Sequence, residues 1–171
     1  WVYGGFRHWG TYNTVAGSFK DANFSDIFYH PTTEQNLNPV WHESVVARFT
    51  VQANQKNKFN LYTDWQYTYF GNCFVPTYLT AISACPEYKN IPQYILQGSW
   101  SSPVTNKLLL EAGGTITPQD FHGYRRPGVS STQFAMNDPT APAGMPQNWG
   151  SSTTYGYNRS DQTNYRASAS Y

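Results

Sequence analysis

Two carboxylates, Asp64 and Glu111, are the residues whose type and spacing could do acid–base chemistry in this 171-residue chain. Each lies on the polar side of a segment in which apolar and polar residues alternate, so a sheet would present both on one face. Paired carboxylates flanking a sugar hydrolyse glycosides, and the six Trp and fourteen Tyr residues could line a sugar-binding cleft. Structural ion pairs are nevertheless more common than catalytic dyads. We therefore interpret Asp64 and Glu111 as members of internal ion pairs and expect no enzymatic activity.

Other reactive side chains lack the spacing that catalysis or metal binding requires. No G-x-S-x-G elbow surrounds a serine, so no nucleophile can be named. The four histidines, His8, His30, His42 and His122, share no ligand spacing. The segment 21–26 places oxygen-bearing side chains as calcium loops do, but lacks the later Gly and Glu of those loops. We expect no metal and no cofactor.

Cys73 and Cys85 are the two cysteines of the chain, and they lie 12 residues apart. Two cysteines cannot form a zinc site without further ligands, and no histidine stands at metal spacing nearby. The sequence therefore favours a local disulfide, which indicates an oxidising, extracytoplasmic setting. Two free thiols are the alternative interpretation.

Charge and composition exclude several classes of protein. Eleven basic and ten acidic residues give a net charge of +1 at pH 7, so no basic surface is available to bind nucleic acid. Charged residues make up only 12% of the chain and aromatic residues 18%. The aromatic content argues against disorder, and the scarcity of good helix formers argues against a helical domain. The sequence predicts an all-β protein.

The elements that must position the carboxylates are long amphipathic strands. From Val45 to Ala53 every second residue is apolar, and the same alternation continues over residues 58–70 after a polar turn at 54–57. Period-two alternation predicts strands with one apolar and one polar face, here joined as a hairpin. We predict six antiparallel strands, paired in chain order, near residues 1–10, 43–54, 58–70, 94–102, 107–117 and 163–171.

The connections between these strands alternate in length. Two are short turns, at 54–57 and 103–106, and the other three would be long loops over 11–42, 71–93 and 118–162. Such loops are uncommon in compact domains, whereas outer-membrane barrels combine short periplasmic turns with long extracellular loops. Twelve residues tilted by about 45° span roughly 28 Å, close to the ~25 Å apolar band of these barrels. The pattern predicts an up-and-down meander that forms part of a transmembrane β-barrel in the bacterial outer membrane.

Charged residues of the predicted strands fall on their polar sides. A charge that faces lipid costs about 2–4 kcal/mol at the membrane midplane, so the polar side should face the lumen of the barrel. Only Glu43, at a strand end, falls in the apolar register. We expect a lumen-facing charged network that consists of Arg48, Lys58, Asp64, Lys107, Glu111 and Arg166.

Four stretches resemble the barrel of TonB-dependent outer-membrane receptors, in particular the Oar-like group with carboxypeptidase-regulatory-like N-terminal domains. They are WVYGGFRHWG (1–10), NKFNLYTDWQ (57–66), QGSWSSPVTNKLLLEAG (97–113) and NYRASASY (164–171). The resemblance implies a barrel of about 22 strands, plugged by an N-terminal domain and energised through the periplasm. Six strands are too few to close a barrel, for which eight is the practical minimum. We therefore expect this chain to be an internal fragment of one.

Two functions are consistent with these patterns. The first is an outer-membrane receptor or transporter whose extracellular loops capture a ligand that the sequence does not identify. Its partners would be the lipid bilayer, the plug domain and a periplasmic energy-coupling protein. The alternative is a secreted β-sandwich that serves as a carbohydrate-binding module or a glycoside hydrolase. A sandwich buries its apolar faces between two sheets, whereas a barrel exposes them to lipid.

Overall fold

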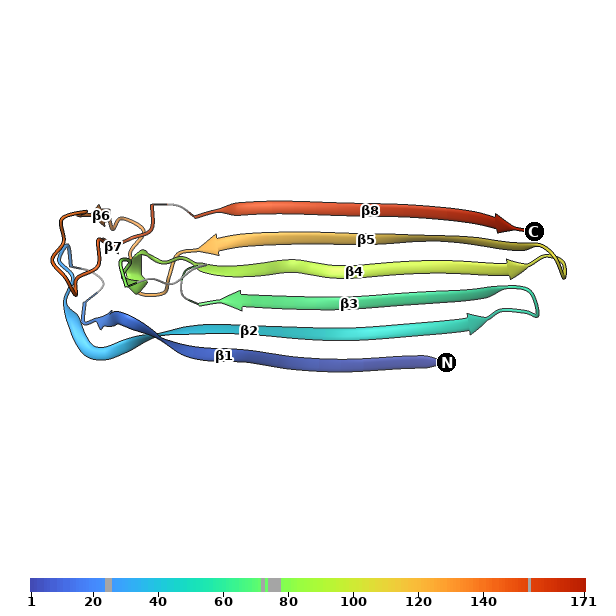
Figure 1. Cartoon of the computed structure of the whole chain (residues 1–171), viewed down its shortest axis with the longest axis horizontal. Coiled ribbons are helices and arrows are strands. Elements are labelled where there is room, and N and C mark those ends of the chain that lie inside the picture. The colour runs from blue at the N-terminus through green and yellow to red at the C-terminus, as the bar shows by residue number, and fades with distance from the viewer. Residues whose placement is uncertain (24–25, 72, 74–77, 154) are drawn as a thin grey trace.

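Six long strands form a single antiparallel sheet, and the predicted all-β meander is confirmed. The computed structural model describes residues 1–23, 26–71, 73, 78–153 and 155–171. The strands pair in the order β1-β2-β3-β4-β5-β8, with β1 and β8 at the two edges (Figure 1). Their bounds are β1 (Val2–Asp21), β2 (Pro31–Gln52), β3 (Lys58–Phe70), β4 (Glu87–Pro103), β5 (Leu109–Tyr124) and β8 (Tyr157–Ser170).

The remaining elements lie with the long connections at one end of the sheet. They are the short pair β6 (Ala135–Asn137) and β7 (Asn148–Gly150) and the single-turn 3-10 helix η1 (Ile82–Ala84). Both chain termini and both tight turns lie at the opposite end (Figure 1). A sandwich needs a second sheet across the apolar face, but within the described ranges only the two-stranded β6–β7 sheet accompanies the large one. The described residues contain no helix long and apolar enough to cross a membrane.

The regular pairing register of the strands gives the sheet one face of apolar side chains and one face of polar side chains. On one face Val45 lies opposite Trp65 and Phe49 opposite Leu61, while Ser44 lies opposite Gln66 on the other face. Because side chains alternate across a strand, this register assigns the apolar positions to one side and the polar positions to the other.

The strands extend beyond their predicted ends. The strand predicted over 1–10 continues to Asp21, and the one predicted from residue 43 begins at Pro31. Most of the predicted loop 11–42 is therefore paired strand, with only 22–30 as connection. Tyr12 still pairs with Pro39 in this region, although apolar and polar residues no longer alternate there. A strand extension that leaves the apolar band needs no alternation, so hydropathy patterning misses it.

The other two long connections are also shorter than predicted. Strand β4 begins at Glu87, β5 runs to Tyr124 and β8 begins at Tyr157. The predicted loops 71–93 and 118–162 therefore shrink to 71–86 and 125–156. The alternation of long and short connections is unchanged.

Side chains close the two tight turns. Asn54 Oδ1 accepts hydrogen bonds from the backbone N–H groups of Lys56 (2.9 Å) and Asn57 (2.8 Å), and Thr105 Oγ1 accepts one from Lys107 N–H (3.2 Å). Local side-chain acceptors of this kind are typical of turns. Lys107 was predicted to lie on a polar strand face, but it lies in the turn before β5, because Thr105 bonds its backbone there.

The buried apolar residues lie at the connection end and not on the main body of the sheet. Among the described residues they are Val15, Tyr29, Ala81, Ala84, Cys85 and Val129. This small core holds the connections together. No described residue covers the apolar face of the sheet in this way, which sets it apart from the sheet of a typical soluble domain.

Candidate functional site: the two faces of the sheet

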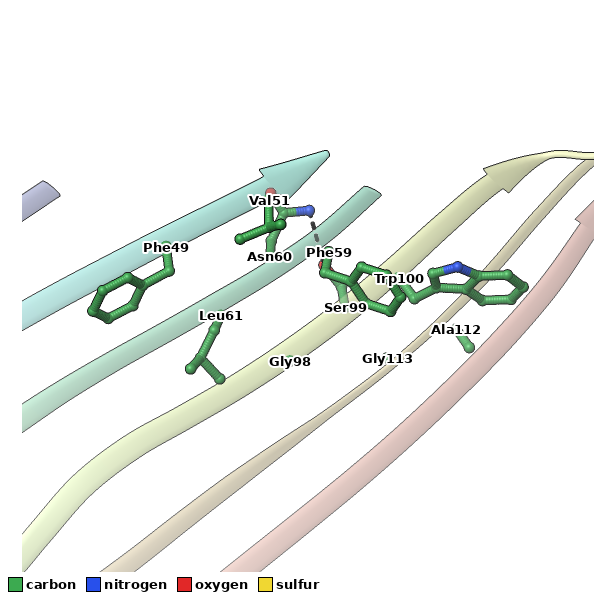
Figure 2. Close-up of a pocket in the computed structure, with 10 residues that line it drawn as sticks. All are labelled: Phe49, Val51, Phe59, Asn60, Leu61, Gly98, Ser99, Trp100, Ala112 and Gly113. Carbon is green, nitrogen blue, oxygen red and sulfur yellow. Dashed lines mark hydrogen bonds between the residues drawn. The ribbon is translucent and has the colours of Figure 1, made fainter. Parts of the chain in front are cut away.

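Large apolar side chains project from one face of the sheet into the surroundings. Val45, Val51 and Trp65 are 54%, 56% and 55% exposed. Figure 2 shows neighbouring members of this face, including Phe59 and Trp100, around a shallow apolar hollow of about 540 Å³. Contiguous apolar surfaces larger than a few hundred Å² mark interaction sites with proteins or membranes.

A charge-free band runs across this apolar face. Its residues, taken strand by strand along the pairing registers, include no charged side chain. They are Val2, Gly4 and Phe6; Val45, Ala47, Phe49 and Val51; Phe59, Leu61, Thr63 and Trp65; Tyr94, Leu96, Gly98, Trp100 and Ser102; Leu110, Ala112, Gly114 and Ile116; and Thr163, Tyr165, Ala167 and Ala169.

Aromatic residues border this charge-free band at both ends. Phe59 lies opposite Trp100 near the tight turns. Toward the connections, the ring of Trp41 lies 4.9 Å from that of Tyr67 and 5.3 Å from that of Tyr69. Ten residues separate Phe59 from Tyr69, which at ~3.3 Å per residue and a tilt of about 45° span roughly 23 Å. This height matches the apolar band and aromatic girdles of outer-membrane barrels.

On the connection side of the charge-free band, charges appear on the apolar face at Glu43, at Lys89 and, on β8, at Asp161, which lies opposite Pro118. Glu43, the predicted exception to charge segregation, lies opposite Tyr67 and is 3.4 Å from His8 Nδ1. Lys89 Nζ lies 5.8 Å from the ring centre of Tyr69. Glu43 and Lys89 are thus at the level of the aromatic border, where the head groups of a bilayer would begin.

The opposite face buries polar groups around Asp64. This residue is 4% exposed, and its carboxylate accepts hydrogen bonds from Ser44 Oγ (2.7 Å) and Gln66 Nε2 (3.0 Å). Arg7 lies 3.9 Å away and supplies a positive charge. Buried carboxylates are stable only when such partners satisfy them, so this polar face is ordered by hydrogen bonds rather than by apolar packing.

The predicted charged network requires correction. The polar face of the strands carries Arg48, Lys58, Asp64, Glu111 and Arg166. Within the described ranges, however, no salt bridge joins any two of them. The partner of Asp64 is Arg7 instead.

Arg7 could not be predicted from the sequence, because aromatic residues occupy both sides of the segment 1–10. The alternation of residue types therefore does not show which face of the strand Arg7 belongs to. Its place opposite Ser44, next to Asp64, follows only from the pairing of β1 with β2. Arg48 lies 5.3 Å from the ring centre of Trp1, another contact across that pair of strands.

Asp64 and Glu111 do not form a catalytic pair. Asp64 lies opposite Ile95, whereas Glu111 lies opposite Ser101, whose partner on β3 is Lys58. The two carboxylates are therefore about six residues apart along the strands, or roughly 20 Å. Glycosidases hold their carboxyl groups at about 5–9.5 Å. In the described parts of the chain, no group of three or more His, Cys, Asp or Glu side chains is placed to hold a metal ion.

A buried arginine ties the connections to the ends of the strands. The Arg126 side chain donates hydrogen bonds to the carbonyl oxygens of Cys85 (3.2 Å) and Gly71, and it lies 3.8 Å from Glu87. Burial lowers the pKa of the Arg126 guanidinium, and the charge of Glu87 opposes this shift. Because a buried charge needs such partners, Arg126 fixes connection 125–156 against connection 71–86.

A disulfide joins Cys73 to Cys85, as predicted, with Cα atoms 4.7 Å apart. We expect neither cysteine to react with a maleimide in unreduced protein, and both to react after reduction. Cys85 is 1% exposed, so burial alone would also protect it. The labelling must therefore be done in denaturant, where only the disulfide bond keeps the two cysteines from reacting with the maleimide. Labelling of either cysteine in denaturant without a reductant would contradict the disulfide.

Comparison of the chain with protein-family models, curated proteins and solved structures finds no match. The functional argument therefore rests on the geometry of the two faces.

Proposed function

We propose that the chain is a segment of an outer-membrane β-barrel receptor or transporter. The supporting observation is the exposed apolar face, whose two aromatic borders lie about as far apart as the hydrocarbon region that such barrels cross is thick. In this proposal the apolar face contacts lipid and the polar face around Asp64 lines the lumen. Connections 22–30, 71–86 and 125–156 face the cell exterior and take part in ligand capture, whereas the turns near 54–57 and 104–108 face the periplasm.

The edges of the sheet add a requirement to this proposal. β1 and β8 each pair with one neighbour in the structure, and hydrocarbon does not tolerate unpaired strand edges. Both must therefore pair with further strands to close the barrel. A plug domain and a periplasmic energy-coupling partner, which the resemblance to TonB-dependent receptors implies, complete the proposed transporter.

Epitope insertion tests this orientation. Gly144 lies in connection 125–156, and a side chain added there would meet nothing within 4 Å, so a short tag after Gly144 should be tolerated. In the full-length protein, an antibody should stain this tag on intact cells. A matched tag after Gln55, in the tight turn, should be stained only after the outer membrane is permeabilised. The opposite pattern, or equal staining of both tags on intact cells, would contradict the proposed topology.

A further inference from the structure

A groove of about 500 Å³ crosses the polar face near the connection end of the sheet. It is separate from the surroundings of Arg48 and Arg166, which line a different hollow nearer the tight turns. Amide and hydroxyl side chains from β3, β4, β5 and β8 dominate its lining. They are Thr68, Asn90, Gln93, Gln119, Asn158 and Ser160. His42 is the histidine of this lining.

A chain of hydrogen bonds fixes the direction of the amides in this groove. An ionised carboxylate only accepts hydrogen bonds, so Gln66 must turn its NH₂ group toward Asp64. Gln66 Oε1 then accepts from Gln93 Nε2 (3.2 Å), and Gln93 Oε1 accepts from Asn90 Nδ2 (3.0 Å). Asp64 thereby sets the orientation of three successive amides.

The last member of this chain leaves an acceptor without a partner. Asn90 is 5% exposed, and its Oδ1 atom is buried with no hydrogen bond from any described residue. Buried carbonyl oxygens are nearly always bonded, so the unpartnered Oδ1 of Asn90, a residue that lines the groove, indicates that a donor is missing at this place.

A β-bulge creates this arrangement. The register between β4 and both of its neighbours shifts between Asn90 and Gln93, around Pro92, which has no N–H to give to a ladder. Without the shift, residues three apart would lie on opposite faces of the strand. The bulge instead places both amides on the polar face, and bulges often direct side chains toward a site in this way.

Aromatic rings supply the apolar part of the groove. Phe70 and Phe121 line it, with ring centres 6.4 Å apart. Tyr88 stacks on Phe121 at 4.9 Å with an interplanar angle of 7°, and His42 meets Phe70 edge to face. These contacts hold the rings in place before any ligand arrives.

We propose that this groove binds a neutral saccharide, an inference that rests on the proposed function because the polar face must be open to water. Sugar hydroxyls both donate and accept hydrogen bonds, as amide and hydroxyl side chains do. The C–H faces of sugar rings are apolar and pack on aromatic rings. Among the described residues of the lining, an acidic ligand would find no Lys or Arg and a basic ligand no Asp or Glu.

The test is binding of the full-length protein in detergent micelles to arrays that carry neutral oligosaccharides, acidic oligosaccharides and uncharged peptides. We expect retention on at least one neutral oligosaccharide. The affinity should fall about tenfold in Asn90→Ala and in Phe121→Ala, since each removes one direct contact. Asn164→Ala, on the same face but outside the groove, should change the affinity less than twofold.

Gln119→Ala serves as a second variant, because Gln119 is an exposed lining residue whose loss should not disturb folding; it too should weaken binding. Retention only on acidic glycans or only on peptides would overturn the inference, as would binding that none of the groove variants weakens or no binding at all. Correct staining of the two epitope tags alongside such a result would show that the groove assignment fails while the barrel topology stands.

Discussion

Replacing Ile116 by Arg is expected to block insertion of the barrel, whereas Thr115→Arg should insert like the wild type. Ile116 is 41% exposed on the apolar face. It pairs with Leu96, which lies opposite Thr63, about midway between the two aromatic borders. An arginine that faces lipid at this depth costs about 2–4 kcal/mol. Thr115, one residue earlier, lies on the polar face between Gln97 and Asn164, where the same charge meets water.

The measurement is the amount of each full-length variant that fractionates with the outer membrane and resists mild denaturant. A loss of more than tenfold for Ile116→Arg and less than twofold for Thr115→Arg corresponds to the expected energies. Equal insertion of the two variants would contradict lipid contact at the apolar face. If only Thr115→Arg failed to insert, the assignment of the two faces to lipid and lumen would have to be exchanged.

Removing the buried carboxylate is the second change with a large expected effect. Asp64→Ala leaves Ser44, which is fully buried, without its acceptor and frees the Nε2 group of Gln66. Each unsatisfied buried polar group costs about 1–3 kcal/mol, so the free energy of unfolding should fall by about 2–4 kcal/mol. Asp64→Asn keeps an acceptor and should lose less.

Urea unfolding of the full-length protein in micelles measures this difference. Glu111→Ala is the matched control, because Glu111 is an exposed carboxylate on the same face with one hydrogen bond, from Ser168. We expect that control to change the free energy of unfolding by less than about 0.5 kcal/mol. Equal losses for Asp64→Ala and Glu111→Ala would show that the hydrogen bonds around Asp64 do not order the polar face.

Much of the sheet could be predicted from the alternation of residue types. The hairpin of β2 and β3 is the clearest case, because apolar and polar residues alternate through both strands up to the turn that joins them. The extension of β1 to Asp21 and the start of β2 at Pro31 could not be predicted in this way, since a strand outside the apolar band has no reason to alternate.

The candidate site was less predictable than the fold. The role of Asp64 as a buried polar residue depends on Arg7, which comes from a segment with aromatic residues on both sides. The ordered amides of Asn90 and Gln93 depend on a bulge, and a bulge reverses the side on which later residues fall. Long-range pairing and register, which a single sequence does not display, therefore determine both features.

The central claim is that successive residues of one strand alternate between lipid and lumen. Nitroxide labels placed one at a time on β5, from Leu110 to Thr117, test it most directly in the full-length protein in lipid bilayers. Collisions with oxygen, which concentrates in hydrocarbon, should peak at Leu110, Ala112, Gly114 and Ile116. Collisions with a water-soluble nickel chelate should peak at the residues between them. The same accessibility at successive positions, or oxygen maxima at Glu111, Gly113, Thr115 and Thr117, would contradict the claim.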